Sequence, residues 1–207
     1  MLLLTESIVQ SNTSSIVTQS GAKMHIVRKV MPTEYNKYRE HLKALDDNSR
    51  HLRFTGTMSD SGIDLICDKI DAEKDQHVLF AIEDVHLQFV AVGHVALGDE
   101  VELALSVLKE HQGKGMGDAL MNRMVHYCRV NGLLKGHMMC LPNNSAMRHL
   151  CSKHGIKMHN DYGDIIGDVE LEAADIPTII EEVGNRNLGF FDFMAKRTLL
   201  PWTILPH

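Results

Sequence analysis

The chain has 207 residues, of which 44% are hydrophobic and 23% are charged. These proportions are ordinary for a globular protein and suggest one domain with extensions. The formal net charge of −6 argues against a nucleic-acid-binding protein, because such proteins usually carry a basic surface.

Membrane insertion, secretion and metal binding have little support in the sequence. No stretch approaches the run of about 20 apolar residues that a membrane span needs, and no basic residue precedes the apolar start at 1–4, as a signal peptide would require. The four cysteines form no CxxC pair, and the thirteen histidines show no HExxH spacing. We therefore expect a cytoplasmic protein with reduced thiols, no membrane or nucleic-acid partner and no metal.

The first part of the chain predicts a tail, a strand and two helices. Residues 1–23 are rich in Ser, Thr and Gln without a sustained period, which predicts a flexible tail. Residues 25–30 alternate enough to predict a first strand. A helix should open at Pro32, and a second one should follow Ser61 as its cap. Their apolar faces would be formed by Tyr35, Tyr38, Leu42 and Leu45, and by Ile63, Ile66, Cys67 and Ile70.

The middle of the chain predicts three strands that lead to a glycine-rich turn. Residues 77–82 and 88–97 predict two strands joined by a hairpin loop. Residues 101–108 are almost continuously apolar, which is typical of a strand buried on both faces. The turn at 113–117 then opens an amphipathic helix, whose apolar positions are Leu120, Met124, Tyr127 and Cys128.

After this helix, residues 135–140 predict a strand parallel to the central one, because a helix joins the two. A helix over 144–154 should end at Gly155, and short strands at 156–158 and 165–171 can complete the sheet. The extension at 173–207 should be helical. Its cluster of apolar side chains should pack on its own domain or on a twin subunit in a homodimer: Phe190, Phe191, Phe193 and Met194.

The glycine-rich turn has the properties of a phosphate-binding site. Glycine adopts backbone angles that other residues avoid, and the first turn of the next helix offers free N–H donors and a positive dipole end. A dinucleotide fingerprint starting at Gly113 would need glycine where Asp118 stands, and the Gly-Lys-Ser/Thr sequence of a P-loop is absent. The pattern that remains is Gln112-x-x-Gly115-x-Gly117, directly after a strand.

This pattern resembles the coenzyme A signature of the Gcn5-related N-acetyltransferases, the GNAT superfamily. Glu102 stands where many members carry a glutamate in the central strand. A second block of the family is matched by Asn144, Met147, Leu150 and Gly155.

The resemblance extends more loosely over residues 24–172, which would form the acetyltransferase domain. The sequence Ser-Arg-x-Leu-Arg-Phe at 49–54 also resembles a segment of the protein-lysine acetyltransferase (Pat-like) branch that borders the acceptor. A solvated turn with Leu52 and Phe54 anchored in the core would explain the same residues.

The resemblance implies an α/β protein of the GNAT fold. Its mixed, mostly antiparallel sheet would be flanked by helices, and the central strand would splay from its parallel neighbour to hold acetyl-CoA as co-substrate. The contacts to acetyl-CoA would come from the backbone of two strand residues, from the turn and from one asparagine: Leu105, Val107, Gln112, Gly113, Lys114, Gly115, Met116, Gly117 and Asn144.

The resemblance also implies roles in the chemistry. A lysine amine with a pKa of about 10.4 arrives protonated at neutral pH, so Glu102, in a partly buried cleft, would act as general base. Alternatively, Glu102 satisfies a buried neighbour or faces solvent at a strand end. Many relatives carry a tyrosine that protonates the thiolate where this chain has Cys151, which is either that acid or a small buried hydrophobe.

Two functions from different classes are consistent with these residues. One is an acetyl-CoA-dependent N-acetyltransferase acting on a protein lysine or a small amine, and the other is a non-catalytic sensor of coenzyme A or acyl-CoA. Only the enzyme needs Glu102 as a base. A polycationic acceptor would call for an acidic groove, and the acidic residues near the acceptor side suit either that groove or solvated helix faces: Asp46, Asp47, Asp60, Asp64, Asp68 and Asp71.

Overall fold

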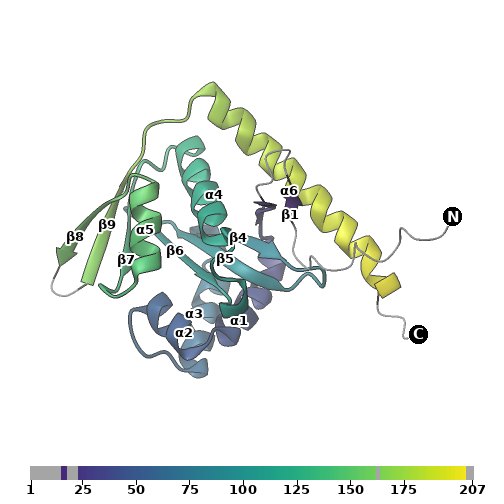
Figure 1. Ribbon diagram of the computed structural model, residues 1–207, viewed down its shortest axis with the longest axis horizontal. Helices are drawn as coiled ribbons and strands as arrows, with labels where there is room; N and C mark the ends of the chain where they lie inside the picture. The colour runs from purple at the N-terminus through teal and green to yellow at the C-terminus, as the bar shows by residue number, and fades with distance from the viewer. Residues whose placement is uncertain (1–14, 18–22, 162–163, 204–207) are drawn as a thin grey trace.

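The structure is a computed structural model that describes residues 15–17, 23–161 and 164–203. Its centre is a seven-stranded sheet in the order β3-β4-β5-β6-β7-β9-β8 (Figure 1). All neighbouring strands pair antiparallel except β6 and β7, which are parallel. The mixed, mostly antiparallel sheet predicted from the sequence is therefore confirmed. The strands are β3 (Arg28–Lys29), β4 (His77–Glu83), β5 (Phe89–Ala96), β6 (Val101–Val107), β7 (Lys135–Cys140), β8 (Lys157–Asp161) and β9 (Asp164–Glu170).

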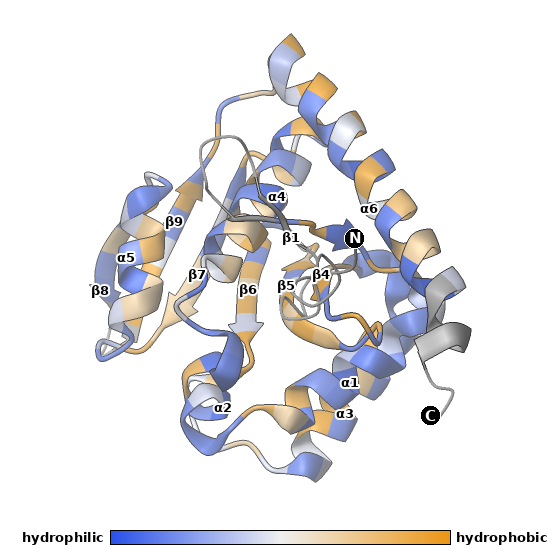
Figure 2. Cartoon of the chain, turned by 45° about the vertical axis from the view of Figure 1, so that its right-hand side comes forward, coloured by the Kyte–Doolittle hydropathy of each residue, from blue (hydrophilic) through white to orange (hydrophobic). Residues whose placement is uncertain are grey.

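Helices cover both faces of this sheet, and the central strands between them are largely hydrophobic (Figure 2). On one face lie α1 (Tyr35–Ala44), α2 (Asp47–Phe54) and α3 (Asp60–Ala72), and on the other lie α4 (Met116–Val130) and α5 (Ser145–Lys153). Strand β4 serves both faces because successive side chains alternate: Leu79 packs with Leu42, and Phe80 packs with Met124. Short 3₁₀ helices occur at η1 (Pro32–Glu34), η2 (Lys74–Gln76) and η3 (Lys109–His111).

The chain departs from the predicted elements near its start. The strand expected at 25–30 is two short strands, because β2 (Lys23–His25) pairs with β1 (Ser15–Val17) in a separate sheet while β3 joins the main one. The rest of the predicted tail, 1–14 and 18–22, lies outside the described residues.

The second helix of the domain was missed. Residues 49–54, for which the sequence left a solvated turn as one explanation, lie in α2. The Asp46 side chain caps this helix by accepting a hydrogen bond from the Ser49 N–H at 3.2 Å. The cap of α3 is Ser59 rather than Ser61, because the Ser59 hydroxyl accepts from the Gly62 N–H at 3.1 Å.

The C-terminal extension contains one long helix, α6 (Ile176–Thr203), which lies across β3 and along α4 (Figure 1). Gly189 permits this contact, because a Cβ at that position would lie 2.7 Å from the Cβ of Arg28. The Arg28 guanidinium lies 4.6 Å from the centre of the Phe193 ring. It also donates to Glu34 at 2.8 Å and to Glu83 at 3.0 Å, which holds in place the guanidinium that contacts α6.

Candidate active site

The parallel strands β6 and β7 separate soon after they begin. Their register contains only two pairs, Val101 with Gly136 and Glu102 with His137, whereas β5 pairs along almost all of β6. A side chain at Gly136 would collide with the carbonyl oxygen of Val101, so glycine allows the strands to touch at this end. Beyond it, the backbone of 103–107 that faces β7 has no strand partner within the described part of the chain. The sheet therefore opens into a gap.

The glycine-rich turn lies at the carboxyl end of β6, beside this gap. Gly113 and Gly115 have φ angles of +71° and +82°, in the left-handed region that favours glycine. Gly115, the N-cap of α4, has no side chain that could cap the helix. The first N–H groups of the helix can therefore face an anion. At Gly117, a Cβ would lie 3.7 Å from Leu150 and 3.8 Å from Leu105, so the missing side chain leaves room between α4, α5 and the gap.

The side chains of the turn are engaged within the protein. Gln112 Nε2 donates to Ser49 Oγ at 3.0 Å and to the Val107 carbonyl at 3.1 Å, which ties α2 and the end of β6 to the turn. Lys114 Nζ donates to the carbonyl of Glu110 at 2.6 Å. The buried side chain of Met116 anchors the start of α4 in the core. The groups left to meet a phosphate are therefore mainly backbone N–H donors.

Glu102 lies at the closed end of the gap. Its partners in the sheet are Ala96 of β5 and His137 of β7. Its side chain is exposed rather than partly buried, because it is the second residue of its strand and lies next to the loop that precedes β6. A carboxylate in this place is open to solvent and to an incoming amine.

Comparison with known proteins matches part of the chain to one family. The model of the acetyltransferase (GNAT) domain matches residues 74–155, the part of the chain that contains the gap and the turn. This part of the chain is similar to the GNAT acetyltransferase superfamily. Acetyltransferase PA5475 of Pseudomonas aeruginosa is 26% identical over 145 residues, which are 67% of this chain and 78% of that protein. Acetyltransferase Pat of Mycolicibacterium smegmatis is 28% identical over 101 residues, which are 46% of this chain and 30% of Pat.

Solved structures of GNAT proteins share the fold of this chain. The GNAT domain of S. lividans PAT has a TM-score of 0.60 at 20% identity, covering 77% of this chain and 97% of that one. The PaiA N-acetyltransferase from Thermoplasma acidophilum, in complex with coenzyme A, has a TM-score of 0.53 at 15% identity, covering 70% of this chain and 98% of that one.

Near Glu102, the GNAT domain holds a group of polar side chains that the sequence analysis missed. His77 Nδ1 lies 3.0 Å from His94 Nε2, and the His94 ring centre lies 5.8 Å from that of Tyr38. The Tyr38 hydroxyl accepts a hydrogen bond from Arg53 at 3.0 Å. Burial lowers the pKa of His94 to about 3, and the nearby Arg53 and His77 act in the same direction. His94 is therefore neutral at physiological pH.

His41 connects α1 to the strand that borders the gap. Its Nδ1 donates to the Phe89 carbonyl at 2.8 Å, and its Nε2 accepts from the Ser106 hydroxyl of β6 at 2.9 Å. Burial lowers the pKa of His41 to about 4, so this neutral tautomer persists at pH 7. The His41–Ser106 bond holds β6 from the face of the sheet opposite α4. The sequence did not predict this bond, because its histidines are scattered without a pattern.

Two further predicted site residues lie in or near the core. Cys151 is 1% exposed, its Sγ lies 3.4 Å from Met138 Sδ, and burial raises its pKa to about 11. These properties favour the buried hydrophobe over the acid. Asn144 is the N-cap of α5, where its side chain accepts from the Met147 N–H at 3.0 Å.

The acidic residues near the acceptor side are largely paired with cations. Asp64 lies 3.2 Å from Arg39 and 2.7 Å from Lys43, and Asp60 lies 2.7 Å from Arg50. Similar pairs join Asp46 to Lys109, Asp68 to Arg39 and Asp71 to Lys74. Such surface pairs are typical of solvated helix faces, and they leave little unpaired acid for a polycationic acceptor.

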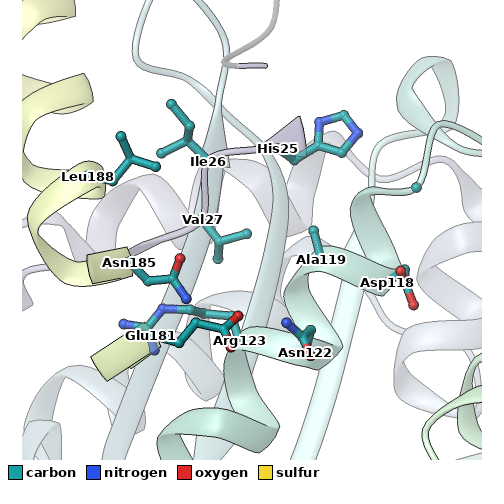
Figure 3. Close-up of a pocket in the computed structure, with 11 residues that line it drawn as sticks. His25, Ile26, Val27, Asp118, Ala119, Asn122, Arg123, Glu181, Asn185 and Leu188 are labelled. Carbon is teal, nitrogen blue, oxygen red and sulfur yellow. The ribbon is translucent and has the colours of Figure 1, made fainter. Parts of the chain in front are cut away.

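A separate cavity of about 280 Å³ lies on the α6 side of the turn (Figure 3). It is lined by β2, the start of α4 and the first half of α6, and it includes His25, Asn122, Arg123 and Asn185. Within the described ranges, no cluster of His, Cys, Asp or Glu could hold a metal ion. Of the helices described, none has the length and apolar character that crossing a membrane requires.

Proposed function

We propose that this chain transfers the acetyl group of acetyl-CoA to a primary amine by direct attack, with Glu102 as the general base. The observation that carries the proposal is the gap between β6 and β7, which opens beside the glycine-rich turn. An extended pantetheine arm suits this gap because it can pair with an unpartnered backbone edge as a strand would. Leu105 and Val107 would supply these backbone groups, and Asn144 would supply an amide from α5.

The turn would hold the pyrophosphate through its backbone. Residues 113–117 bring free N–H groups and the positive end of α4 to one place. The Gln112 and Lys114 side chains already bond to the protein, so they would shape the turn rather than clasp the phosphates. Met116 would keep the helix end in position from the core.

The chemistry needs four steps that these groups can provide. A backbone N–H of β6 would polarise the acetyl carbonyl, as in an oxyanion hole. Glu102 would take a proton from the ammonium, directly or through water, and the free amine would attack the thioester carbon. Collapse of the intermediate breaks the C–S bond and releases the thiolate. Water would protonate this thiolate, since Cys151 is buried and its pKa is raised.

A protein lysine is the acceptor we propose first. The segment at 49–54 that resembles the protein-lysine branch forms α2, and Ser49 of this helix bonds to Gln112 of the turn. Two similar proteins carry the names Pat and PAT, which agrees with this branch. A small-molecule amine is the alternative acceptor. A sensor without catalysis fits less well, because the family is one of acetyltransferases and a sensor has no use for Glu102.

Calorimetry of acetyl-CoA binding tests the site. Wild type should bind, and Gly115→Glu, which adds bulk and negative charge to the turn, should not. Gly132→Glu is the matched control, because Gly132 also has a positive φ of +72° and an open Cβ position but lies at the far end of α4. Absent wild-type binding, or equal loss in both variants, would contradict the assignment.

An acetylation assay tests the base. Glu102→Gln should lower kcat with a peptide-lysine acceptor by about 100-fold or more. The exposed neighbour Glu100 provides the control, because Glu100→Gln makes the same change just outside β6. If Glu102→Gln keeps full activity at neutral pH, another group accepts the proton.

A further inference from the structure

The domain-facing side of α6 is held by contacts within one chain. Thr178 and Phe193 are buried at 6% and 7% exposure. Glu182 forms an ion pair with Arg123 of α4, and Lys196 donates to the Glu83 carbonyl at 3.2 Å. The monomer therefore has what it needs to hold α6 in place.

The opposite side of α6 carries an apolar stripe with no such partner among the described residues. Its members follow the i, i+3, i+4, i+7 spacing of one helix face from 176 and continue on that face after a gap, and each is between 43% and 73% exposed: Ile176, Ile179, Ile180, Val183, Phe190, Phe191 and Met194. Hydrophobic segments recur along the length of the helix (Figure 2). At about 200 Å² for a large apolar side chain, this outer stripe presents roughly 800 Å². Exposed Arg186 and Asn187 separate its two parts, 176–183 and 190–194. Their combined apolar area still exceeds what monomers usually expose without a function.

We propose that the outer stripe is the interface with a second copy of this chain, packed as an antiparallel pair of α6 helices. A specific dimer buries about 800 Å² on each partner, which matches the stripe, and a two-fold axis sets one patch against itself. Gly184 lies near the middle of the stripe, and a Cβ there would meet nothing within 4 Å, so the two helices can approach closely.

The charges at the two ends of α6 select the antiparallel arrangement. Exposed Glu172 and Asp175 lie just before its start, and exposed Arg197 lies near its end. An antiparallel pair sets the acidic end of one helix beside the basic end of the other, and it also opposes the two helix dipoles. A parallel pair would bring like charges together, and acidic residues beside the stripe would repel an anionic membrane surface.

Sedimentation velocity of the full chain tests this interface. Wild type should sediment with twice the chain mass at micromolar concentration, and Ile180→Glu combined with Phe191→Glu should halve that mass without changing the circular dichroism spectrum. Leu65→Glu is the control, because Leu65 is 72% exposed on α3 and lies outside the stripe. A monomeric wild type, or a dimer that survives the double change, would overturn the proposal.

An independent observation concerns the loop that the proposed function assigns to pyrophosphate. His25, the last residue of β2, is 8% exposed, and its Nε2 lies 2.6 Å from the Lys114 carbonyl oxygen. Since a carbonyl can only accept, Nε2 carries the proton. In Figure 3, His25 lies on β2 beside the start of α4, next to Ala119 and Asp118.

This bond fixes the direction of the next N–H group. In a trans peptide, the Lys114 carbonyl and the Gly115 N–H point in opposite directions. Holding the carbonyl toward β2 therefore turns the Gly115 N–H to the other side of the turn. Glycine by itself would allow this peptide to rotate readily. We infer that His25 is a positioning residue that orients the turn for pyrophosphate, an inference that rests on the proposed function.

Ligand selectivity tests the role of His25. His25→Leu should weaken coenzyme A binding about tenfold in calorimetry but leave binding of pantetheine, which lacks the pyrophosphate, unchanged in a ligand-observed NMR titration. His25→Gln keeps a donor and should restore coenzyme A binding. Equal weakening for both ligands would indicate a general structural effect and overturn the inference, as would unchanged coenzyme A binding. A wild type that binds neither ligand would refute the proposed function as well.

Discussion

Two buried neutral histidines should make this protein lose stability as the pH falls below neutrality. Burial is the main cause that lowers the pKa of His41 to about 4 and that of His94 to about 3. In the unfolded chain, each returns to a pKa of about 6.5. Between these values the unfolded state binds more protons than the folded one, so the free energy of unfolding rises with pH across this window.

The size of the effect follows from these pKa values. Between pH 7.5 and 5.5, each histidine should remove about 1.4 kcal/mol from the free energy of unfolding, and the two together about 3 kcal/mol. The loss should continue as the pH falls toward the folded pKa values. Carboxylates whose pKa is lowered in the fold, such as Asp118 and Glu34, act in the same direction but below about pH 5.

Urea unfolding at pH 5.5, 6.5 and 7.5 measures this loss. His94→Leu removes one of the two groups, so it should lower the loss over the same interval to about 1.4 kcal/mol, whatever it does to absolute stability. His86→Leu is the control, because His86 is exposed in the β4–β5 hairpin. A stability that does not change between pH 7.5 and 5.5, or a His94→Leu slope equal to wild type, would refute the reasoning.

Three other substitutions have defined outcomes. Arg28→Ala should lower the free energy of unfolding by about 3 kcal/mol or more in urea, because the buried Glu83 loses its closest cation. A change below about 1 kcal/mol would mean that Lys37, whose Nζ lies 3.7 Å from Glu83 Oε1, is a sufficient partner. Cys151→Ala should keep kcat within about twofold and cost about 1 kcal/mol of stability. A tenfold loss of kcat would instead support Cys151 as the acid that protonates the thiolate. Asn144→Ala should cost about 1 kcal/mol through the lost cap of α5 and raise the Kd for acetyl-CoA, and an unchanged Kd would remove Asn144 from the site.

The phosphate turn was predictable because its requirements are local. A positive φ at Gly113 and Gly115 depends on those residues themselves, and the apolar run that precedes them identifies the strand. The parallel pairing of β6 and β7 follows from the helix between them. Fold class and family could therefore be inferred from about fifty consecutive residues.

The rest depends on contacts between distant residues, which periodicity does not reveal. His41 meets Ser106 across 65 positions of sequence, and His25 meets Lys114 across 89. Gly189 shows the same limit, because its small size matters only once α6 lies against Arg28. The exposure of Glu102 likewise follows from where β6 begins in the assembled sheet, and the sequence offered it only as one alternative.

The short pairing between β6 and β7 also divides the sheet mechanically. Strands β3 to β6 form one hydrogen-bonded body and β7, β9 and β8 form another, and only two registered positions join them. Local opening should therefore cost least along this line, and amide hydrogens in β7 that face β6 should exchange with solvent sooner than those in β5. A molecule that bridges the two bodies, as the proposed pantetheine arm would, should slow that exchange, so ligand binding would join the two halves of the sheet into one.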